Sequence, residues 1–405
     1  MDSLSKTSLN ISKGYEVLAL KYRPKLFKEL LGQNHVVRIL QNALKEEKVH
    51  HAFLITGIRG VGKTTLARII AMAVNCLNFN SNGTMEPCLK CTSCYPIIQR
   101  NQQDVIEIDA ASNTGVGDIR EVIDDSKYLP VNAQYKIFII DEVHMLSSSA
   151  FNALLKILEE PPKHVKFILA TTELKKVPLT IISRCQRLDL HRVGFESLYS
   201  HLNMVSCLEN FTLEKEAAYL LINAAGGSVR DALSMLDQAV LCSQDYNIKV
   251  AVIEGMLAIT SATSIYQIFS CIIEGDIKKL LQIIRRLYSQ GANLPCLLTA
   301  LSDIAHKISL LKINDKDEMI NSDVEREYCR KNVKNLSMIT LMRLWQMLQK
   351  SYADLKNSAN ELASVEMSMI KIIHANLEIS PEEALALIHQ RGDDKSVGDT
   401  IKKKE

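Results

Sequence analysis

The sequence lacks any marked excess of charge of one sign. It carries 48 Lys and Arg against 46 Asp and Glu, a formal net charge of +2 over 405 residues. A chain balanced in this way does not bind nucleic acid through bulk positive charge. Any contact with DNA must therefore come from a local arrangement of side chains.

Long apolar runs are also missing. No stretch approaches 18 uninterrupted apolar residues, which argues against a transmembrane helix and a membrane partner. Residues 1–14 are polar and lack the apolar core of a signal peptide, so we expect a loose tail there and a cytoplasmic chain. Internal repeats and low-complexity tracts are absent as well.

What the sequence does contain is typical of a globular protein. Hydrophobic residues make up 47% of the chain and charged residues 23%, which is enough apolar material for sizeable cores. At roughly 150 residues per domain, this length indicates two or three domains.

From about residue 15 to residue 190, short apolar runs alternate with segments of helical period. The runs have the length of strands and cover residues 51–56, 104–108, 136–140 and 166–170. Near-continuous apolar runs suit a parallel sheet that is buried on both faces. Residues 15–190 are therefore predicted to form an α/β domain around such a sheet.

The chain changes character after residue 190. Residues 191–256 show helical patterns broken at Gly226-Gly227 and no strand-like run, which predicts a small helical domain. Between residues 296 and 380 there is no Gly or Pro, and Leu, Ile and Met recur at helical spacing. This pattern predicts an all-α domain over residues 257–380, followed by a short polar tail over 381–405.

A glycine-rich segment directly follows the first predicted strand and opens a predicted helix. It fits the phosphate-loop pattern G-x-x-x-x-G-K-[ST], and with the next residue it consists of Gly57, Ile58, Arg59, Gly60, Val61, Gly62, Lys63, Thr64 and Thr65. Glycines let backbone N–H groups wrap phosphates, and the helix N-terminus adds its positive dipole end. Lys63 would then neutralise the phosphates of ATP and Thr64 would hold Mg²⁺. A plain strand–helix turn is the alternative.

Acids and hydroxyls follow two further predicted strands. Asp141 and Glu142 come directly after a buried run, which places them at the carboxyl edge of the sheet, where ligands bind in open α/β sheets. Asp141 would reach the Mg²⁺ and Glu142 would polarise the attacking water. Thr171 and Thr172 end another strand and could orient that water. Solvated loop acids, and threonines without a functional role, are the alternatives.

The cysteines are unevenly spaced. Four of the ten fall in one short window, with two C-x₂-C steps, at Cys76, Cys88, Cys91 and Cys94. Four thiolates match tetrahedral zinc coordination, and no His or carboxylate is placed for an open, catalytic metal. The pattern predicts a structural zinc site, with unrelated buried thiols or a redox pair as alternatives.

Two arginines are further candidates. Ser228 to Asp231 predict a capping box, Ser at the N-cap and Asp at N3, which places Arg230 in the first turn of a helix. A cation is disfavoured there by the helix dipole, so a phosphate could be the reason for it. A surface arginine is the alternative. The residues around Arg184 (Ser183-Arg184-Cys185) do not by themselves indicate a function for it.

These motifs occur in one order that is specific to a known family. The ordered set is Tyr22-Arg23-Pro24, the phosphate loop, the four cysteines, 104–112 (DVIEIDAAS), 139–146 (IIDEVHML), 151–162 (FNALLKILEEPP), 170–172 (ATT), 183–185 (SRC) and 226–234 (GGSVRDALS). Over about residues 15–380 the chain resembles the γ/τ subunits of bacterial DNA polymerase III, the AAA+ ATPases of the sliding-clamp loader.

The resemblance implies an α/β nucleotide domain, a helical lid over 191–256 and a helical collar over 257–380 that assembles a ring. It implies that Thr172 is the first sensor, that Arg230 is the second sensor on the γ-phosphate, and that Arg184 reaches a neighbouring subunit's ATP. It also places Arg23 and Pro24 beside the adenine and makes the four cysteines zinc ligands.

The function that the resemblance implies is DNA-stimulated ATP hydrolysis that loads a sliding clamp onto primed DNA. The implied partners are further copies of the chain, subunits of the delta and delta-prime type, the clamp, and DNA held by its backbone. The family often has Arg where this chain has Asn113, which weakens a DNA phosphate contact there. The longer family form carries a C-terminal extension that binds the polymerase and the helicase, so coupling to the polymerase core is left open.

Three other functions compete with this one. A branch-migration helicase is a different AAA+ machine, but the cysteine insert (residues 76–94) and the long collar argue against it. A non-catalytic scaffold subunit would not need intact Lys63, Thr64, Asp141 and Glu142. Polymerase activity is not expected, because no separate acidic metal site for nucleotide addition is visible.

Overall fold

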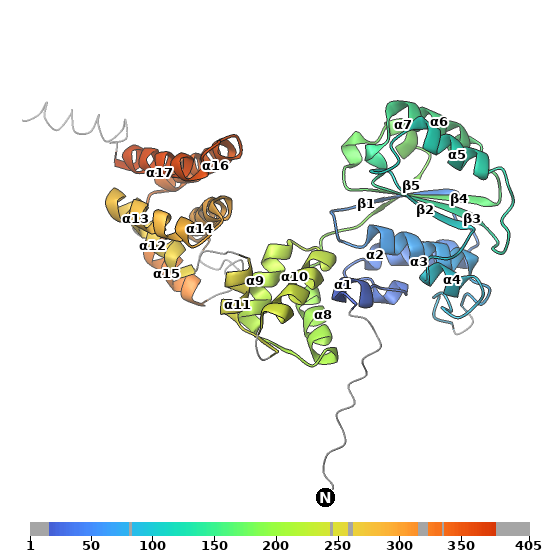
Figure 1. Ribbon diagram of the computed structural model, residues 1–405, viewed down its shortest axis with the longest axis horizontal. Helices are drawn as coiled ribbons and strands as arrows, with labels where there is room; N and C mark the ends of the chain where they lie inside the picture. Colours follow the sequence, from blue (N-terminus) through green and yellow to red (C-terminus); the bar gives the residue numbers. More distant parts are fainter. Residues whose placement is uncertain are drawn as a thin grey trace, which may run out of the picture. The chain divides into compact units, whose positions relative to one another are not determined.

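The computed structural model describes residues 16–80, 83–243, 246–257, 262–314, 323–333 and 336–377 (Figure 1). These residues divide into two compact units, with the boundary between Ile253 and Glu254. The tails predicted over 1–14 and 381–405 lie outside the described residues.

A five-stranded parallel sheet forms the centre of the first unit. Its strands lie in the order β2-β3-β4-β1-β5. Their bounds are β1 Ala52–Thr56, β2 Val105–Asp109, β3 Lys136–Asp141, β4 Val165–Thr171 and β5 Gln186–Asp189. The predicted α/β architecture with a parallel sheet is confirmed.

Three of the four predicted apolar runs form the interior strands β1, β3 and β4, whose two faces are both covered, while the fourth forms the edge strand β2, none of whose residues is fully buried. Every residue of β1 is buried, and the rings of Phe138 in β3 and Phe167 in β4 stack with centroids 5.5 Å apart. The edge strand β5 was not predicted. Only Leu188 of its four residues is buried, so its sequence lacks the apolar run by which the other strands are recognised.

Helices cover both faces of the sheet (Figure 1). On one face α5 (Val116–Asp125) and α6 (Ser148–Glu159) pack against alternate strand residues, among them Leu54, Phe138 and Leu169. On the other face α3 (Lys63–Asn75) contacts β1, β3 and β4. The remaining elements of this part are α1 Leu18–Lys21, η1 Phe27–Glu29, α2 Asn34–Lys45, α4 Cys94–Ile98, η2 Val143–Met145, η3 Leu174–Lys176 and α7 Leu179–Ile182.

The predicted small helical domain is confirmed as a helical subdomain of the first unit. It contains α8 Phe195–Leu208, α9 Lys215–Ala225, α10 Val229–Cys242 and α11 Val250–Met256. The prediction that strands end after His191 was wrong, because β6 (Thr212–Leu213) and β7 (Asn247–Ile248) pair in parallel. Two residues per strand are too few to leave a period in the sequence.

The turn between α9 and α10 uses the predicted glycines and half of the predicted capping box. Gly226 ends α9 in the left-handed region at φ 57°, and Ser228 Oγ accepts from the Asp231 N–H at 3.2 Å. The return contact from Asp231 is not made, because the Ser228 N–H donates to Ala225 O at 3.0 Å instead. The N-cap is confirmed and the reciprocal box was wrong.

The second unit is all-helical in its described residues, as predicted. It consists of α12 Ala262–Glu274, α13 Ile277–Ser289, α14 Leu294–Ile313, α15 Asp323–Val333, α16 Met338–Lys356 and α17 Glu361–Leu377, which share one apolar core. Among the described residues α14 alone is long and apolar enough to span a membrane by length and composition. Half of its apolar window is buried inside the unit, where Leu298, Leu301 and Ile308 form part of the core.

Candidate functional site

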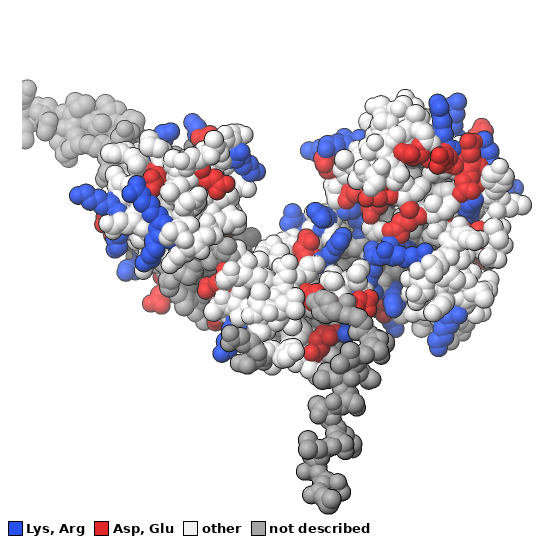
Figure 2. All heavy atoms as spheres, in the orientation of Figure 1, with Lys and Arg blue, Asp and Glu red and all other residues white. Residues whose placement is uncertain are grey.

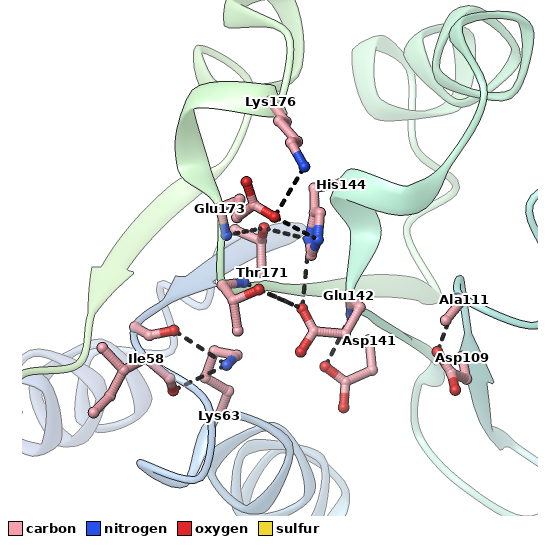
Figure 3. Close-up of polar contacts among 12 residues, drawn as sticks. Ile58, Lys63, Asp109, Ala111, Asp141, Glu142, His144, Thr171, Glu173 and Lys176 are labelled. Carbon is pink, nitrogen blue, oxygen red and sulfur yellow. Dashed lines mark hydrogen bonds and ion pairs between the residues drawn. The ribbon is translucent and has the colours of Figure 1, made fainter. Parts of the chain in front are cut away.

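The glycine-rich segment forms the turn between β1 and α3, where the sequence places it. Gly60 and Gly62 adopt φ angles of 74° and 111°, which only glycine adopts without strain. Lys63 is the first residue of α3, and its ammonium donates to Gly57 O and Ile58 O at 3.1 Å each (Figure 3). Burial lowers the pKa of Lys63, and the nearby Glu142 and Asp141 counter that effect. The turn therefore holds a desolvated cation beside backbone N–H groups.

The predicted magnesium ligands lie side by side. The Thr64 hydroxyl donates to Asp141 Oδ2 at 2.5 Å, although the two residues come from α3 and the end of β3. The other Asp141 oxygen accepts from the Glu142 N–H at 2.9 Å. A hydroxyl and a carboxylate at the carboxyl edge of the sheet are suited to a hard cation such as Mg²⁺.

Glu142 is held by the end of the neighbouring strand β4. Its Oε2 accepts from the Thr172 hydroxyl at 3.0 Å and from the Thr172 N–H at 3.2 Å. Glu142 itself adopts φ 48°, a left-handed conformation that is strained for a residue with a side chain. The structure therefore brings the predicted water-polarising acid and the predicted sensor hydroxyl into direct contact.

A histidine extends this network, and the sequence reasoning missed it. His144 Nδ1 lies 3.1 Å from Thr171 Oγ1 and 3.4 Å from Glu142 Oε2, while its Nε2 lies 3.5 Å from Glu173 Oε1 (Figure 3). Glu173 in turn pairs with Lys176 at 2.9 Å. His144 lies within the quoted motif IIDEVHML, two residues after Glu142, and that proximity was the available signal.

A cavity of about 860 Å³ opens beside the turn. This volume lies within the range of roughly 300–1,000 Å³ that small-molecule sites occupy. The sequence-predicted residues that line it are Arg23, Pro24, Arg59, Gly60, Val61, Gly62, Lys63, Thr64, Thr65, Asp141, Glu142 and Arg230. The structure thus gathers the N-terminal segment, the glycine-rich turn and the helical subdomain around one space.

The cavity wall is rich in arginine. Arg23 donates to Thr65 Oγ1 at 2.9 Å, and its pKa is lowered to about 10 by burial and by the nearby Arg68 and Arg100. Arg68 and Arg100 also line the cavity, and sequence reasoning missed both. Arg68 is paired with Glu107 through two contacts of 2.8 and 2.6 Å. Mutual repulsion among these cations favours an anionic ligand such as a polyphosphate.

The helical subdomain touches the turn at Gly60. The Arg230 N–H donates to Gly60 O at 3.2 Å, which places the first turn of α10 directly over the turn. A Cβ at Gly60 would lie 2.0 Å from Ser228 Oγ and 3.2 Å from Arg230 Cβ. Gly60 is therefore required both by its backbone angle and by the close approach of α10.

Arg184 lies apart from the cavity. It follows α7, donates to Thr180 O at 2.7 Å and forms an ion pair with Glu159 at the end of α6. Its side chain is 32% exposed. The structure places Arg184 where it does not meet the turn of its own chain.

The four clustered cysteines come together as predicted. Their Sγ atoms all lie within 4.8 Å of one another, and sulfurs bound to one zinc ion at 2.3 Å would be about 3.8 Å apart. Cys76 directly follows α3 and Cys94 begins α4, so the cluster joins the two helices. Although burial opposes it, N–H groups of Cys94, Leu77 and Ser93 lower the pKa of Cys91 to about 6. The cluster can hold one metal ion.

Three family models match consecutive parts of the chain. The model described as DNA polymerase III, delta subunit, matches residues 32–194. The DNA polymerase III clamp loader subunit, ATPase lid domain, matches 197–245, and DNA polymerase III subunits gamma and tau domain III matches 248–388.

Curated relatives match most of the chain. The DNA polymerase III subunit gamma of Buchnera aphidicola subsp. Schizaphis graminum is 37% identical over 89% of this chain and 98% of its own length. The subunit tau/gamma of Haemophilus influenzae is 37% identical over 89% of this chain, which spans about half (51%) of that relative. The Bacillus subtilis subunit tau is 39% identical over 88% of this chain and 63% of its own length.

Solved structures are more distant. The Thermotoga maritima RuvB Holliday junction branch migration motor is 20% identical with a TM-score of 0.44, covering 62% of this chain and 80% of that one. The Bacillus subtilis DNA clamp loader delta protein is 14% identical with a TM-score of 0.36, covering 83% of this chain and 99% of that one. Likenesses this weak do not bear on function.

The contact between the turn and α10 can be tested at Gly60. We expect Gly60→Ala to lower the free energy of unfolding by about 2–4 kcal/mol, because left-handed strain adds to overpacking against Ser228. Gly62→Ala is the matched control: its φ is 111° but nothing lies within 4 Å of an added Cβ. Strain alone should cost it about 1–2 kcal/mol. Urea unfolding measures both.

A compensating change separates the two causes. Adding Ser228→Ala to Gly60→Ala removes the hydroxyl that lies 2.0 Å from the new Cβ. We expect the double variant to be more stable than the sum of the two single changes predicts. Simple additivity would show that α10 does not press on the turn.

Proposed function

The chain belongs to the γ/τ subunit family of bacterial DNA polymerase III, and on that basis we propose that it is the ATP-driven motor subunit of a clamp loader. The observation that carries the proposal is the single cavity around Lys63, Thr64, Asp141, Glu142 and Arg230. Phosphoryl transfer requires groups of these kinds: a cation, a hydroxyl, two acids and a second cation, which here comes from the lid. A non-catalytic scaffold subunit would not need all five.

The residues divide the work of hydrolysis among them. Lys63 and Arg230 bind the β- and γ-phosphates of ATP, and the backbone N–H groups of the turn wrap them. Thr64 and Asp141 hold Mg²⁺, which neutralises phosphate charge when it is bound. Arg23 and Pro24 form the wall toward the adenine. The rate gain comes from positioning and from electrostatic stabilisation of the transferred phosphoryl group.

Glu142 has to change partner before it can polarise water. Its Oε2 is held by the Thr172 hydroxyl and N–H, with His144 3.4 Å away. A γ-phosphate offers Thr172 a competing acceptor, because phosphate oxygens take charge-assisted hydrogen bonds. Once Thr172 turns to the phosphate, Glu142 is free to orient the attacking water. In this way Thr172 would report that ATP is present.

Arg184 would serve a different chain's ATP. It lies outside the cavity of its own chain and near the surface, paired with Glu159. In a ring of subunits such an arginine can reach across an interface and stabilise the phosphoryl charge of its neighbour. Each site would then be complete only after assembly.

The proposed partners follow from clamp loading. They are further copies of this chain, subunits of the delta and delta-prime type, the sliding clamp and primed DNA in the cytoplasm. DNA would be held through its phosphate backbone without base recognition, because no basic helix suited to reading bases is visible in the sequence. No polymerase activity is proposed for this chain.

Clamp loading itself is the test of the proposed function. The assembled loader should place a labelled sliding clamp on primed circular DNA when ATP is present, and Lys63→Ala should lower the rate at least about 10²-fold, as loss of a preorganised charge contact does. Strand displacement or branch migration without clamp loading would favour the helicase instead. If Lys63→Ala loaders placed the clamp on DNA as fast as wild-type loaders, the chain would be a non-catalytic scaffold.

Mixed loaders test the role of Arg184. Arg184→Ala should bind ATP almost normally, because its own cavity is unchanged, while hydrolysis in the ring should fall by about 10³–10⁵-fold, as for other arginine fingers. In mixtures with Lys63→Ala subunits, a subunit with an intact phosphate loop should hydrolyse ATP only when its neighbour carries Arg184. Full activity in a pure Arg184→Ala ring would falsify the assignment.

We also propose that the cysteine cluster holds a structural Zn²⁺. The supporting observation is the mutual approach of four Sγ atoms within 4.8 Å, the donor set that tetrahedral zinc prefers. A redox pair does not need four thiols at one point.

The zinc proposal predicts the behaviour of Cys91→Ser. We expect its zinc affinity to drop roughly 100-fold or more, beyond the 10–100-fold that changes outside the ligand shell produce. Urea unfolding should show lower stability, because metal binding contributes to folding. Cys207→Ser is the control, since Cys207 is exposed and outside the cluster. Metal analysis that finds no zinc in the purified wild type would overturn the proposal.

A further inference from the structure

A buried glutamate ties the cysteine insert to the N-terminal segment. Glu86 Oε2 accepts from the Phe27 N–H at 2.7 Å, and its Oε1 accepts from the Lys28 N–H at 3.0 Å. Glu86 is only 8% exposed and Phe27 only 1%. A carboxylate is rarely buried without partners, and here both of its oxygens are occupied by backbone N–H groups.

The contact with Glu86 lies between two stretches of the chain that line the cavity. Tyr22, Arg23 and Pro24 precede the two N–H groups in the chain and line the cavity, and Leu30 and Leu31 follow them and line it as well. The N-terminal segment therefore approaches the cavity on both sides of the point that Glu86 holds. Moving that point would displace the wall that the nucleotide base is proposed to contact.

The other end of the tie is close to the cysteine cluster. Only Pro87 separates Glu86 from Cys88, and proline fixes its own φ and restricts the residue before it. Cys88 is in turn joined to the cluster through its N–H, which donates to Cys76 Sγ at 3.3 Å. A short, stiff stretch of chain thus links the Glu86 carboxylate to the four sulfurs.

We propose that Glu86 is a positioning residue that couples metal binding at the four cysteines to the affinity of the cavity for ATP. With the metal in place, Glu86 holds Phe27 and Lys28, and the wall around Arg23 and Pro24 is preorganised. Without it, the insert loses its fixed geometry and the wall loses its support. The inference rests on the proposed ATP and zinc sites, and it makes the zinc more than a local stabiliser.

The experiment measures ATP affinity with and without zinc in the wild type and in Glu86→Ala. A fluorescent ATP analogue is titrated against full-length protein, either zinc-loaded or stripped with a chelator that is removed before excess Mg²⁺ is added. Zinc content is determined for each sample. Removing zinc from the wild type should weaken binding about 5- to 10-fold, the lower part of the range for coupled sites. Glu86→Ala should keep its zinc and show the same weakening.

The decisive comparison is the stripped Glu86→Ala protein. If Glu86 carries the coupling, zinc removal should not weaken ATP binding further in this variant. Turnover at saturating ATP should equal that of the wild type in zinc-loaded Glu86→Ala, because Glu86 is remote from the reacting phosphate and only KM changes. Glu86→Gln keeps one acceptor oxygen and should fall between the wild type and Glu86→Ala.

Glu29 provides a matched control. Its carboxylate also accepts from two N–H groups of the same segment, Lys25 at 2.7 Å and Leu26 at 3.2 Å, but it is exposed and both of these hydrogen bonds stay within its own segment. Glu29→Ala should leave ATP affinity and its response to zinc unchanged. An equal loss of ATP affinity in Glu29→Ala would show that any carboxylate that accepts from N–H groups of this segment has the same effect. That result would overturn the role of Glu86.

The remaining outcomes separate this inference from the proposed function. A wild type that binds no ATP would overturn both. A wild type whose ATP affinity is unaffected by zinc removal, or a Glu86→Ala protein that loses affinity on zinc removal as much as the wild type, would overturn only the coupling. The stripped wild type needs no substitution, so it still gives a result if Glu86→Ala does not fold.

Discussion

Five parallel strands end within about one residue of each other along the sheet, and at that edge apolar side chains give way to polar ones. The register pairs Asp109 with Asp141, and Thr56 with both Thr171 and Asp189. Backbone hydrogen bonds fix this register, and a slip of one residue would turn these polar side chains to the opposite face. The contacts of Asp141 with Thr64, and of Glu142 with Thr172, depend on that alignment.

Around this edge, three segments that are distant in the sequence close one cavity. The turn after β1 lies at the sheet, the N-terminal segment is held by Glu86, and α10 is held against Gly60. Each contributes at least one cation, such as Arg23, Lys63 or Arg230. The pKa of Arg23 is lowered to about 10, first by burial and then by repulsion from nearby cations, Arg230 among them. A polyphosphate relieves that repulsion, so its binding should draw the three segments together.

The sequence reveals those parts of the site that are local in the chain. The glycine-rich turn, Asp141-Glu142 and the C-x₂-C steps each carry their chemistry within a few residues, and the structure brings each set together. The interior strands were also predictable, because burial on both faces leaves a continuous apolar run. The edge strand β5 and the two-residue strands β6 and β7 leave no such run. Contacts between distant segments, such as Glu86 with Phe27 or Arg68 with Glu107, have no periodicity and require the folded chain.

The resting position of Arg184 is consistent with a residue that is released on assembly. Its partners are Thr180 O and the exposed Glu159, and exposed ion pairs of this kind contribute only about 0–1 kcal/mol. A finger that stabilises a neighbour's transferred phosphoryl group is worth roughly 10³–10⁵ in rate, or about 4–7 kcal/mol of barrier. Breaking the pair is therefore a small penalty against the gain in an assembled ring. Because Glu159 holds the side chain without burying it, Arg184 remains available to another chain.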